Sequence, residues 1–117
     1  MTAGSQSGSL FVGVDGGGTG CRARLEDAEG RLLGTGIAGP AALRIGVDNA
    51  LAEVEKACRL ALEEAGLGSG ALSSVHAAVG LAGVGRKGAL EQLVLRPHPF
   101  HSVIYAHDAT IACMGAH

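Results

Sequence analysis

Near the start of the chain, a short apolar segment ends in a carboxylate and runs into a glycine-rich turn. Leu10–Asp15 (LFVGVD) is followed by Gly16, Gly17, Gly18, Thr19 and Gly20. A short apolar run predicts a buried strand, and consecutive glycines predict a tight turn after it. Because three adjacent glycines cost more chain entropy than a simple turn requires, we expect this turn to serve a ligand.

The residue types in this turn favour a phosphate as the ligand. Glycines lack Cβ atoms, so their backbone N–H groups can approach a phosphate closely. The Thr19 hydroxyl can donate to a phosphate oxygen, and Asp15 can hold Mg²⁺ through water, since Mg²⁺ keeps most of its waters. The competing interpretation is a glycine-rich hairpin without a ligand. The turn is not a P-loop, because no Gly-Lys-Ser/Thr follows it.

The remaining sequence alternates between strand and helix patterns. Further strands are predicted at Cys21–Glu26, Arg31–Ala38, Ser74–Gly80 and Ser102–Ala106, and helices at Asn49–Ala65, Lys87–Leu95 and Ala109–Ala116. The resulting order is β-β-β-α-β-α-β-α, in which the first three strands are spaced closely enough to form an antiparallel meander. This order predicts an α/β domain with a mixed sheet and helices on its faces.

Single residues indicate where some of these elements end. Gly30 suits a positive φ in the turn between the second and third strands. Asp48 is the predicted N-cap of the first helix, and Gly66 is predicted to stop it. Residues 1–9 are predicted to form a disordered tail. Because the last predicted helix has barely two turns, residues 10–117 are expected to be one domain of a longer protein.

Composition and charge exclude several classes of protein. With 47% apolar residues the chain is not a disordered segment, and its low aromatic content predicts a core of Val, Leu, Ile and Ala. The net charge is −2 and the basic residues are scattered, so we expect no nucleic-acid partner.

No apolar run is long enough for a membrane span, and the first residues do not form a signal peptide. Cys21, Cys58 and Cys113 are dispersed and odd in number, which favours free thiols in a reducing cytoplasm.

Asp108 follows the last predicted strand. Ligands of open α/β sheets bind beyond the carboxyl ends of the strands, where Asp15 also lies. A lone carboxylate there can act as the general base for a hydroxyl nucleophile. It can equally serve as the N-cap of the predicted helix Ala109–Ala116. Arg22 also has two interpretations, as a neighbour of bound phosphates or as a solvated side chain on its strand.

A second glycine pattern offers a competing function. Gly83, Gly85 and Gly88 fit G-x-G-x-x-G, and Asp108 follows a further strand about 20 residues on, as in dinucleotide-binding domains. The pattern lies late in the chain, and only a short helix fits between it and the following prolines. It also leaves Asp15–Thr19 unexplained, so we favour the phosphate interpretation.

Four segments together resemble the N-acetylglucosamine/glucosamine kinase group. They are GVDGGGT (Gly13–Thr19), GTGIAGPA (Gly34–Ala41), AVGLAGVGR (Ala78–Arg86) and HDATIA (His107–Ala112). This group is part of the BadF/BadG/BcrA/BcrD-type ATPase family, which also contains activators of benzoyl-CoA reductase and 2-hydroxyglutaryl-CoA dehydratase. The family lies in the actin–hexokinase superfamily. The resemblance therefore implies a ribonuclease-H-like, actin-like ATPase domain for residues 10–117.

The resemblance also implies a reaction and a set of site residues. ATP with Mg²⁺ would transfer its γ-phosphoryl group to the 6-hydroxyl of glucosamine or N-acetylglucosamine. Asp15–Thr19, with Gly20 and Arg22 beside them, would hold the phosphates, and Asp15 would face Mg²⁺. Asp108 would be the catalytic base. The sugar would contact Ala42, Gly83, Val84, Gly85, His107 and Asp108. A homodimer is compatible with this assignment.

The sequence departs from the kinase pattern at two positions. Gly20 stands where many relatives carry Lys or another large polar residue, and Ala42 stands where relatives often have Asn as a sugar contact. The family's second phosphate loop and adenosine loop would lie beyond residue 117, so the chain alone is expected to bind ATP weakly and to show no turnover. The alternative within the family is an activator ATPase, whose cysteines hold an iron–sulfur cluster. The dispersed cysteines of this chain favour the kinase.

Overall fold

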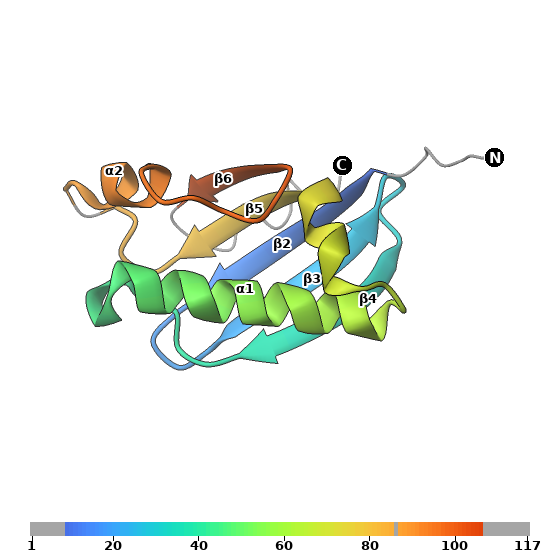
Figure 1. The fold of residues 1–117 in the computed structure, drawn as a ribbon. Coiled ribbons are helices and arrows are strands. Elements are labelled where there is room, and N and C mark those ends of the chain that lie inside the picture. Colours follow the sequence, from blue (N-terminus) through green and yellow to red (C-terminus); the bar gives the residue numbers. More distant parts are fainter. Residues whose placement is uncertain (1–8, 86, 107–117) are drawn as a thin grey trace.

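A mixed sheet of five strands forms the centre of the domain (Figure 1). The computed structural model describes residues 9–85 and 87–106. The strands are β2 (Leu10–Gly16), β3 (Cys21–Asp27), β4 (Leu32–Ala38), β5 (Val75–Leu81) and β6 (Ser102–Ala106), in the order β4-β3-β2-β5-β6. β2, β3 and β4 form an antiparallel meander, whereas β5 runs parallel to β2 and β6 runs parallel to β5. The predicted meander and mixed sheet are confirmed, and each strand begins and ends within one residue of its prediction.

Four helical segments connect the strands of the described chain. They are η1 (Leu43–Ile45), α1 (Val47–Glu64), η2 (Ser69–Ser74) and α2 (Ala89–Val94). α1 runs across one face of the sheet, where it packs mainly on β4 and β3 (Figure 1). α2 is shorter than the predicted helix Lys87–Leu95. The predicted helix Ala109–Ala116 lies outside the described residues.

The start of α1 differs from the prediction. The helix begins at Val47 rather than at Asn49, and Gly46, with φ of 134°, occupies the N-cap position without a side-chain hydrogen bond. Asp48 is therefore not a cap. It lies in the first turn of α1, where its Oδ1 accepts a hydrogen bond from Arg96 Nε at 2.9 Å. The prediction was wrong because the helix begins before Asp48, after the turn at Gly46, so Asp48 already lies inside its first turn.

Small residues allow α1 to lie very close to β4. A Cβ on Gly34 would collide with the backbone of Ala61, and a Cβ on Gly36 would collide with the backbone of Ala57. At the end of the helix, Glu64 Oε1 accepts a hydrogen bond from the Thr35 amide at 2.7 Å. Helix and strand are therefore in backbone contact, which any side chain at the two glycines would prevent.

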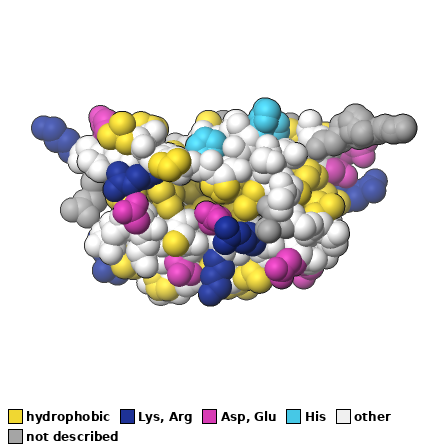
Figure 2. All heavy atoms as spheres, viewed as in Figure 1, with side chains coloured by type: hydrophobic (Ala, Val, Ile, Leu, Met, Phe, Trp, Pro, Cys, Tyr) yellow, Lys and Arg dark blue, Asp and Glu magenta, His cyan; other side chains and the backbone are white. Residues whose placement is uncertain are grey.

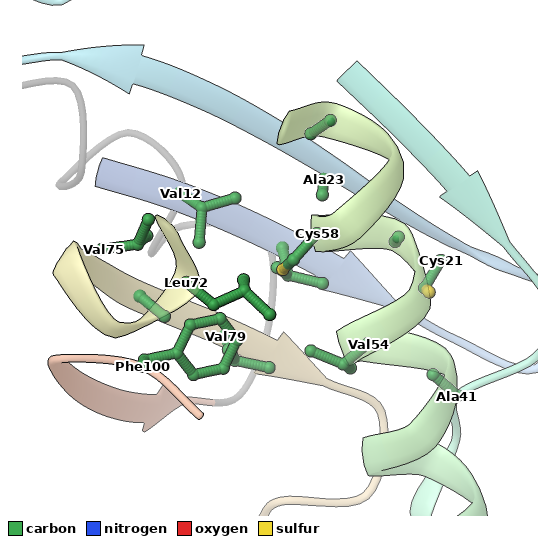
Figure 3. Close-up of a cluster of buried hydrophobic side chains, with 14 of the residues drawn as sticks. Val12, Cys21, Ala23, Ala41, Val54, Cys58, Leu72, Val75, Val79 and Phe100 are labelled. Carbon is green, nitrogen blue, oxygen red and sulfur yellow. The ribbon is translucent and has the colours of Figure 1, made fainter. Parts of the chain in front are cut away.

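The core between α1 and the sheet consists mainly of Val, Leu and Ala side chains (Figure 3). β2 and β3 alternate, so that Val12, Val14, Ala23 and Leu25 point into the core. Phe100, which is 9% exposed, closes one end of this cluster. The predicted core with little aromatic content is confirmed for the described residues.

An apolar hollow of about 250 Å³ lies between α1 and the segment before β6. It is lined by side chains of α1, by Val79 and Tyr105, and by residues 96–100, with the Asp48–Arg96 ion pair among them. Figure 2 shows apolar side chains between α1 and the elements above it, whereas acidic and basic side chains alternate over α1 itself. None of the helices within residues 9–85 and 87–106 is long and apolar enough to cross a bilayer.

Two free thiols, Cys21 and Cys58, are buried in the core (Figure 3). Burial, followed by the negative charge of Glu53, raises the pKa of the Cys21 thiol to about 11. Burial also raises the pKa of the Cys58 thiol to about 12, with smaller contributions from Cys21 and Glu55. Because only a thiolate reacts or binds metal readily, both groups are expected to be inert near neutral pH.

We expect a side chain at position 36 to destabilise the domain. Gly36→Ala forces α1 away from β4, and overpacking of this kind costs about 1–3 kcal/mol. Urea unfolding of the intact protein should therefore show a lower midpoint for this variant. Gly68→Ala is the matched control, because a Cβ at position 68 meets nothing within 4 Å. Equal midpoints for the two variants would contradict the close helix–strand contact.

The buried thiols predict a loss of stability in alkaline solution. The pKa of Cys58 is raised from 9.0 to about 12 in the folded state, so the stabilisation is complete below pH 9. Above pH 9 the unfolded chain loses its thiol proton first, and the free energy of unfolding falls as the pH rises. Unfolding between pH 8 and 10.5 should show a shallower decline for Cys58→Ala than for the wild type. Parallel curves would mean that the Cys58 thiol is not held in its neutral form.

Candidate functional site

Three loops meet at one edge of the sheet. β4 is antiparallel to β3, which is antiparallel to β2, so β4 and β2 point the same way as β5. The loops that leave these three strands therefore lie at the same edge. They are the glycine turn Gly16–Gly20, the segment Gly39–Ala42, and the turn that follows Leu81.

Backbone hydrogen bonds fasten the three loops to one another. The Ala41 amide donates to the Gly17 carbonyl at 2.9 Å, and the Ala82 amide donates to the Gly16 carbonyl at 3.0 Å. The Leu43 amide donates to the Ala82 carbonyl at 3.1 Å, which joins the second loop to the third. The edge is thus one preformed unit rather than three independent turns.

Packing explains the glycine at position 16 but not the one at position 17. A Cβ on Gly16 would lie 2.7 Å from Leu81 Cδ2 and 3.0 Å from Ala41 Cβ, so the fold excludes a side chain there. A Cβ on Gly17 would meet nothing within 4 Å, and its φ lies outside the left-handed region. The Gly17 amide closes the turn by donating to the Gly20 carbonyl at 2.9 Å. A plain hairpin would therefore tolerate a side chain at position 17.

The next two amides of the turn are available to a ligand. Neither the Gly18 nor the Thr19 N–H donates to an acceptor within the described part of the chain. Both residues are exposed and lie between the ends of β2 and β3. Exposed amides in a glycine-rich turn can bind an anion. The phosphate-binding role of this turn stays a prediction.

Asp15 and Arg22 lie beside this turn on adjacent strands. They are paired in register between β2 and β3, and both are exposed. A hollow of about 330 Å³, which we call the carboxylate hollow, is lined by Asp15, Thr19, Gly20, Cys21, Arg22 and Ile37. The structure therefore brings the predicted nucleotide residues together, on the face of the sheet opposite to the buried side chains Val12 and Val14.

The carboxylate of Asp15 fits Mg²⁺ held through water better than a closed metal cage. Among the described residues, no group of three or more His, Cys, Asp or Glu side chains is arranged to hold a metal ion. Mg²⁺ commonly binds through one carboxylate, several waters and substrate phosphates, and a lone carboxylate beside the predicted phosphate loop fits that arrangement.

A second hollow of about 270 Å³ joins the glycine turn to the predicted sugar side. We call it the acceptor hollow, and it is lined by Gly18, Ala42, Arg44, Ala82 and Gly83. Ala42 and Gly83, which come from different loops, thus face the same space, and Gly83 has φ of 100°. Val84 packs against the hydrophobic core, and Gly85 is exposed.

Arg44 is a residue of this site that the sequence analysis missed. Its Nη2 lies 3.1 Å from the position that a Cβ on Gly18 would take. The available signal was a lone arginine just after the Gly39–Ala42 loop, in a segment without clear helix or strand periodicity. Such a signal cannot be connected to Gly18 without knowing how the loops pack.

The end of β6 lies at the same edge of the sheet. Ala106 is paired with Gly80 of β5, and Gly80 is paired with Asp15 of β2. His107 and Asp108 are outside the described residues, so the general-base and N-cap interpretations of Asp108 both remain predictions.

The structure gives no support to the dinucleotide-binding alternative. In that motif the third glycine packs a long helix against the strand. Here a Cβ on Gly88 would meet nothing within 4 Å, and the helix begins only after it and spans six residues, Ala89–Val94. The G-x-G-x-x-G spacing is therefore part of a connecting turn.

Comparison with known proteins gives one family. Residues 12–117 match the BadF/BadG/BcrA/BcrD ATPase family. The chain is 40% identical over 109 residues to glucosamine kinase GspK of Vibrio cholerae serotype O1, a match that covers 93% of this chain and 37% of that protein. It is also similar to the crystal structure of a candidate N-acetylglucosamine kinase from Chromobacterium violaceum, with a TM-score of 0.77 and 30% identity.

That structural match covers 86% of this chain and 35% of the other protein, so the chain spans little more than a third of either relative. The family match, in contrast, covers nearly the whole chain. The chain therefore belongs to the BadF/BadG/BcrA/BcrD ATPase family, and its five-stranded mixed sheet has the actin-like ATPase fold.

Proposed function

We propose that this domain is the N-terminal part of an ATP-dependent amino-sugar kinase. The reaction is transfer of the γ-phosphoryl group of ATP to the 6-hydroxyl of glucosamine or N-acetylglucosamine. The observation that carries this proposal is the glycine turn, in which Gly17 is not required by the fold and two neighbouring amides are available. The two similar proteins named above, a glucosamine kinase and a candidate N-acetylglucosamine kinase, support it.

The glycine turn and the carboxylate hollow hold the nucleotide phosphates. The amides of Gly18 and Thr19 donate to phosphate oxygens, together with the Thr19 hydroxyl, and Arg22 lies at the edge of the same hollow. Asp15 holds Mg²⁺ through water, and the metal neutralises charge on the phosphates. Positioning and electrostatic stabilisation are the main catalytic contributions in phosphoryl transfer, and a preformed edge of three bonded loops is suited to both.

The sugar occupies the side of the edge formed by Ala42, Gly83 and their neighbours. Ala42 and Gly83 line the acceptor hollow next to Gly18, so an acceptor bound there lies beside the nucleotide phosphates. Val84 supports the loop from the core, and Gly85 and His107 are further sugar contacts implied by the family resemblance, of which His107 lies outside the described residues. Asp108 takes the proton from the 6-hydroxyl while the sugar oxygen bonds to the γ-phosphorus and ADP leaves.

The buried thiols favour the kinase over the activator ATPase of the same family. A cluster ligand must be an accessible thiolate. Cys21 and Cys58 are buried, and their pKa values are raised to about 11 and about 12. Because both side chains lie in the core of the domain, neither Cys21 nor Cys58 is placed to hold a cluster between subunits, and Cys113 lies outside the described residues.

Substitution of Gly17 separates ligand binding from folding. Because a Cβ at this position meets nothing in the fold, Gly17→Ala should leave the melting temperature of the intact protein unchanged. The methyl group would nevertheless stand between the turn and a phosphate, and we expect kcat/KM for ATP to fall at least about tenfold. Gly70→Ala is the matched control, because a Cβ on Gly70, in η2, also meets nothing within 4 Å. If both variants kept full activity, the turn would not contact the nucleotide.

The function itself is tested with the intact protein, Mg-ATP and individual sugars. We expect release of ADP and formation of a sugar 6-phosphate with glucosamine or N-acetylglucosamine, and no heat of binding with NAD. Asp108→Asn should lower kcat by about 10²–10⁴-fold while ATP affinity changes little, because a general base acts only in the chemical step. Wild-type turnover in Asp108→Asn would exclude the base assignment and favour the N-cap role.

A further inference from the structure

The guanidinium of Arg44 is placed against the glycine turn by the loops around it. Arg44 lies in the single turn η1, between Leu43 and Ile45. The Ala41 and Leu43 amides are bonded to the Gly17 and Ala82 carbonyls, which fixes the backbone on the side of η1 that precedes Arg44. The Arg44 side chain then reaches Gly18, where Nη2 lies 3.1 Å from the position of an added Cβ.

Arg44 has no ion-pair partner in the described part of the chain. Among the described arginines, Arg24, Arg31, Arg59 and Arg96 each form an ion pair with a carboxylate, whereas Arg44 and Arg22 do not. η1 also has no acidic residue in its first turn. Within residues 9–85 and 87–106, a cation is therefore held beside Gly18 without a carboxylate partner.

A cation beside the glycine turn would complement the charge of a bound triphosphate, in addition to Mg²⁺. Between Asp15 and Cys21 the turn consists of four glycines and Thr19, and it carries no positive charge. Arg22 stands on the far side of the turn, in the carboxylate hollow. Arg44 lines the acceptor hollow together with Gly18 and with Ala42 and Gly83 of the predicted sugar side.

We propose that Arg44 contacts the terminal phosphoryl group of ATP, the group that is transferred. This inference rests on the proposed kinase function and adds a residue to it. The acceptor hollow joins the phosphate turn to the sugar side, and the terminal phosphoryl group is the part of ATP that must lie between them. A guanidinium can donate two parallel hydrogen bonds to phosphate oxygens, which suits both charge and geometry.

The test compares ATP and ADP binding in the intact protein. Isothermal titration with Mg²⁺ present should show that Arg44→Ala weakens ATP binding by about tenfold or more, because a charge-assisted contact is lost. ADP lacks the terminal group, so its affinity should change by less than about twofold. Arg44→Lys should recover only part of the ATP affinity, since a lysine lacks the planar fork. Added guanidinium ion should partly restore turnover in Arg44→Ala and not in the wild type.

Arg24→Ala is the matched control. Arg24 is an exposed arginine on β3, paired in register with Gly13 and ion-paired with Glu26 at 3.8 Å, away from the turn. We expect this variant to bind ATP and ADP as the wild type does. Because Arg44 is exposed, Arg44→Ala should also keep the wild-type melting temperature.

Three results would overturn the Arg44 proposal. They are unchanged ATP affinity in Arg44→Ala, an equal loss for ATP and ADP, and a raised sugar KM with normal ATP binding, which would assign Arg44 to the acceptor. The proposed kinase function fails separately, if the wild type binds ATP but phosphorylates no sugar. In that case a selective loss of ATP binding in Arg44→Ala would still support the phosphate contact.

Discussion

The close approach of α1 to β4 is the constraint on which the rest of the structure depends. Gly34 and Gly36 present no side chains, so the backbone of Ala57 and Ala61 lies directly against the strand. Such a narrow interface has room only for small and branched aliphatic side chains in the adjoining core, which explains a core rich in Val, Leu and Ala. Its stabilisation comes from many close dispersion contacts rather than from a few large side chains.

α1 also sets the position of the functional edge. Glu53, on this helix, accepts a hydrogen bond from the Gly39 amide at 2.8 Å through Oε1, and its backbone carbonyl accepts one from Cys21 Sγ at 3.3 Å. Gly39 leads into Ala41, whose amide is bonded to the carbonyl of Gly17. The Glu53 carboxylate and the loop that contains Gly39 and Ala41 thus link α1 to the turn that we assign to phosphate binding.

Sequence patterns predicted the elements whose form is decided locally. Apolar side chains alternate at Val12 and Val14, which predicts a strand with one buried face, and apolar side chains repeat about every 3.6 residues in α1, which predicts a helix with one buried face. Both patterns depend only on the geometry of a single strand or helix. The errors and omissions concern features that a local pattern does not contain. Asp48 was assigned as a cap because Asp favours that position, whereas the helix begins at Val47 after Gly46. Arg44 was missed because only the folded loops place it beside Gly18.

The three glycines of the turn are adjacent, but the fold constrains them to different degrees. At Gly16 a Cβ would lie 2.7 Å from Leu81 Cδ2 and 3.0 Å from Ala41 Cβ, so packing excludes a side chain, whereas at Gly18 it would lie 3.1 Å from Arg44 Nη2 and shift only the end of an exposed side chain. At Gly17 the space is open and φ lies outside the left-handed region, so the fold gains nothing from glycine. Gly68 and Gly70 are equally open, so an unneeded glycine does not by itself indicate a ligand. What distinguishes Gly17 is its place in a turn beside the exposed residues Gly18 and Thr19, whose amides donate to no acceptor in the described part of the chain, and this combination supports the proposed phosphate contact.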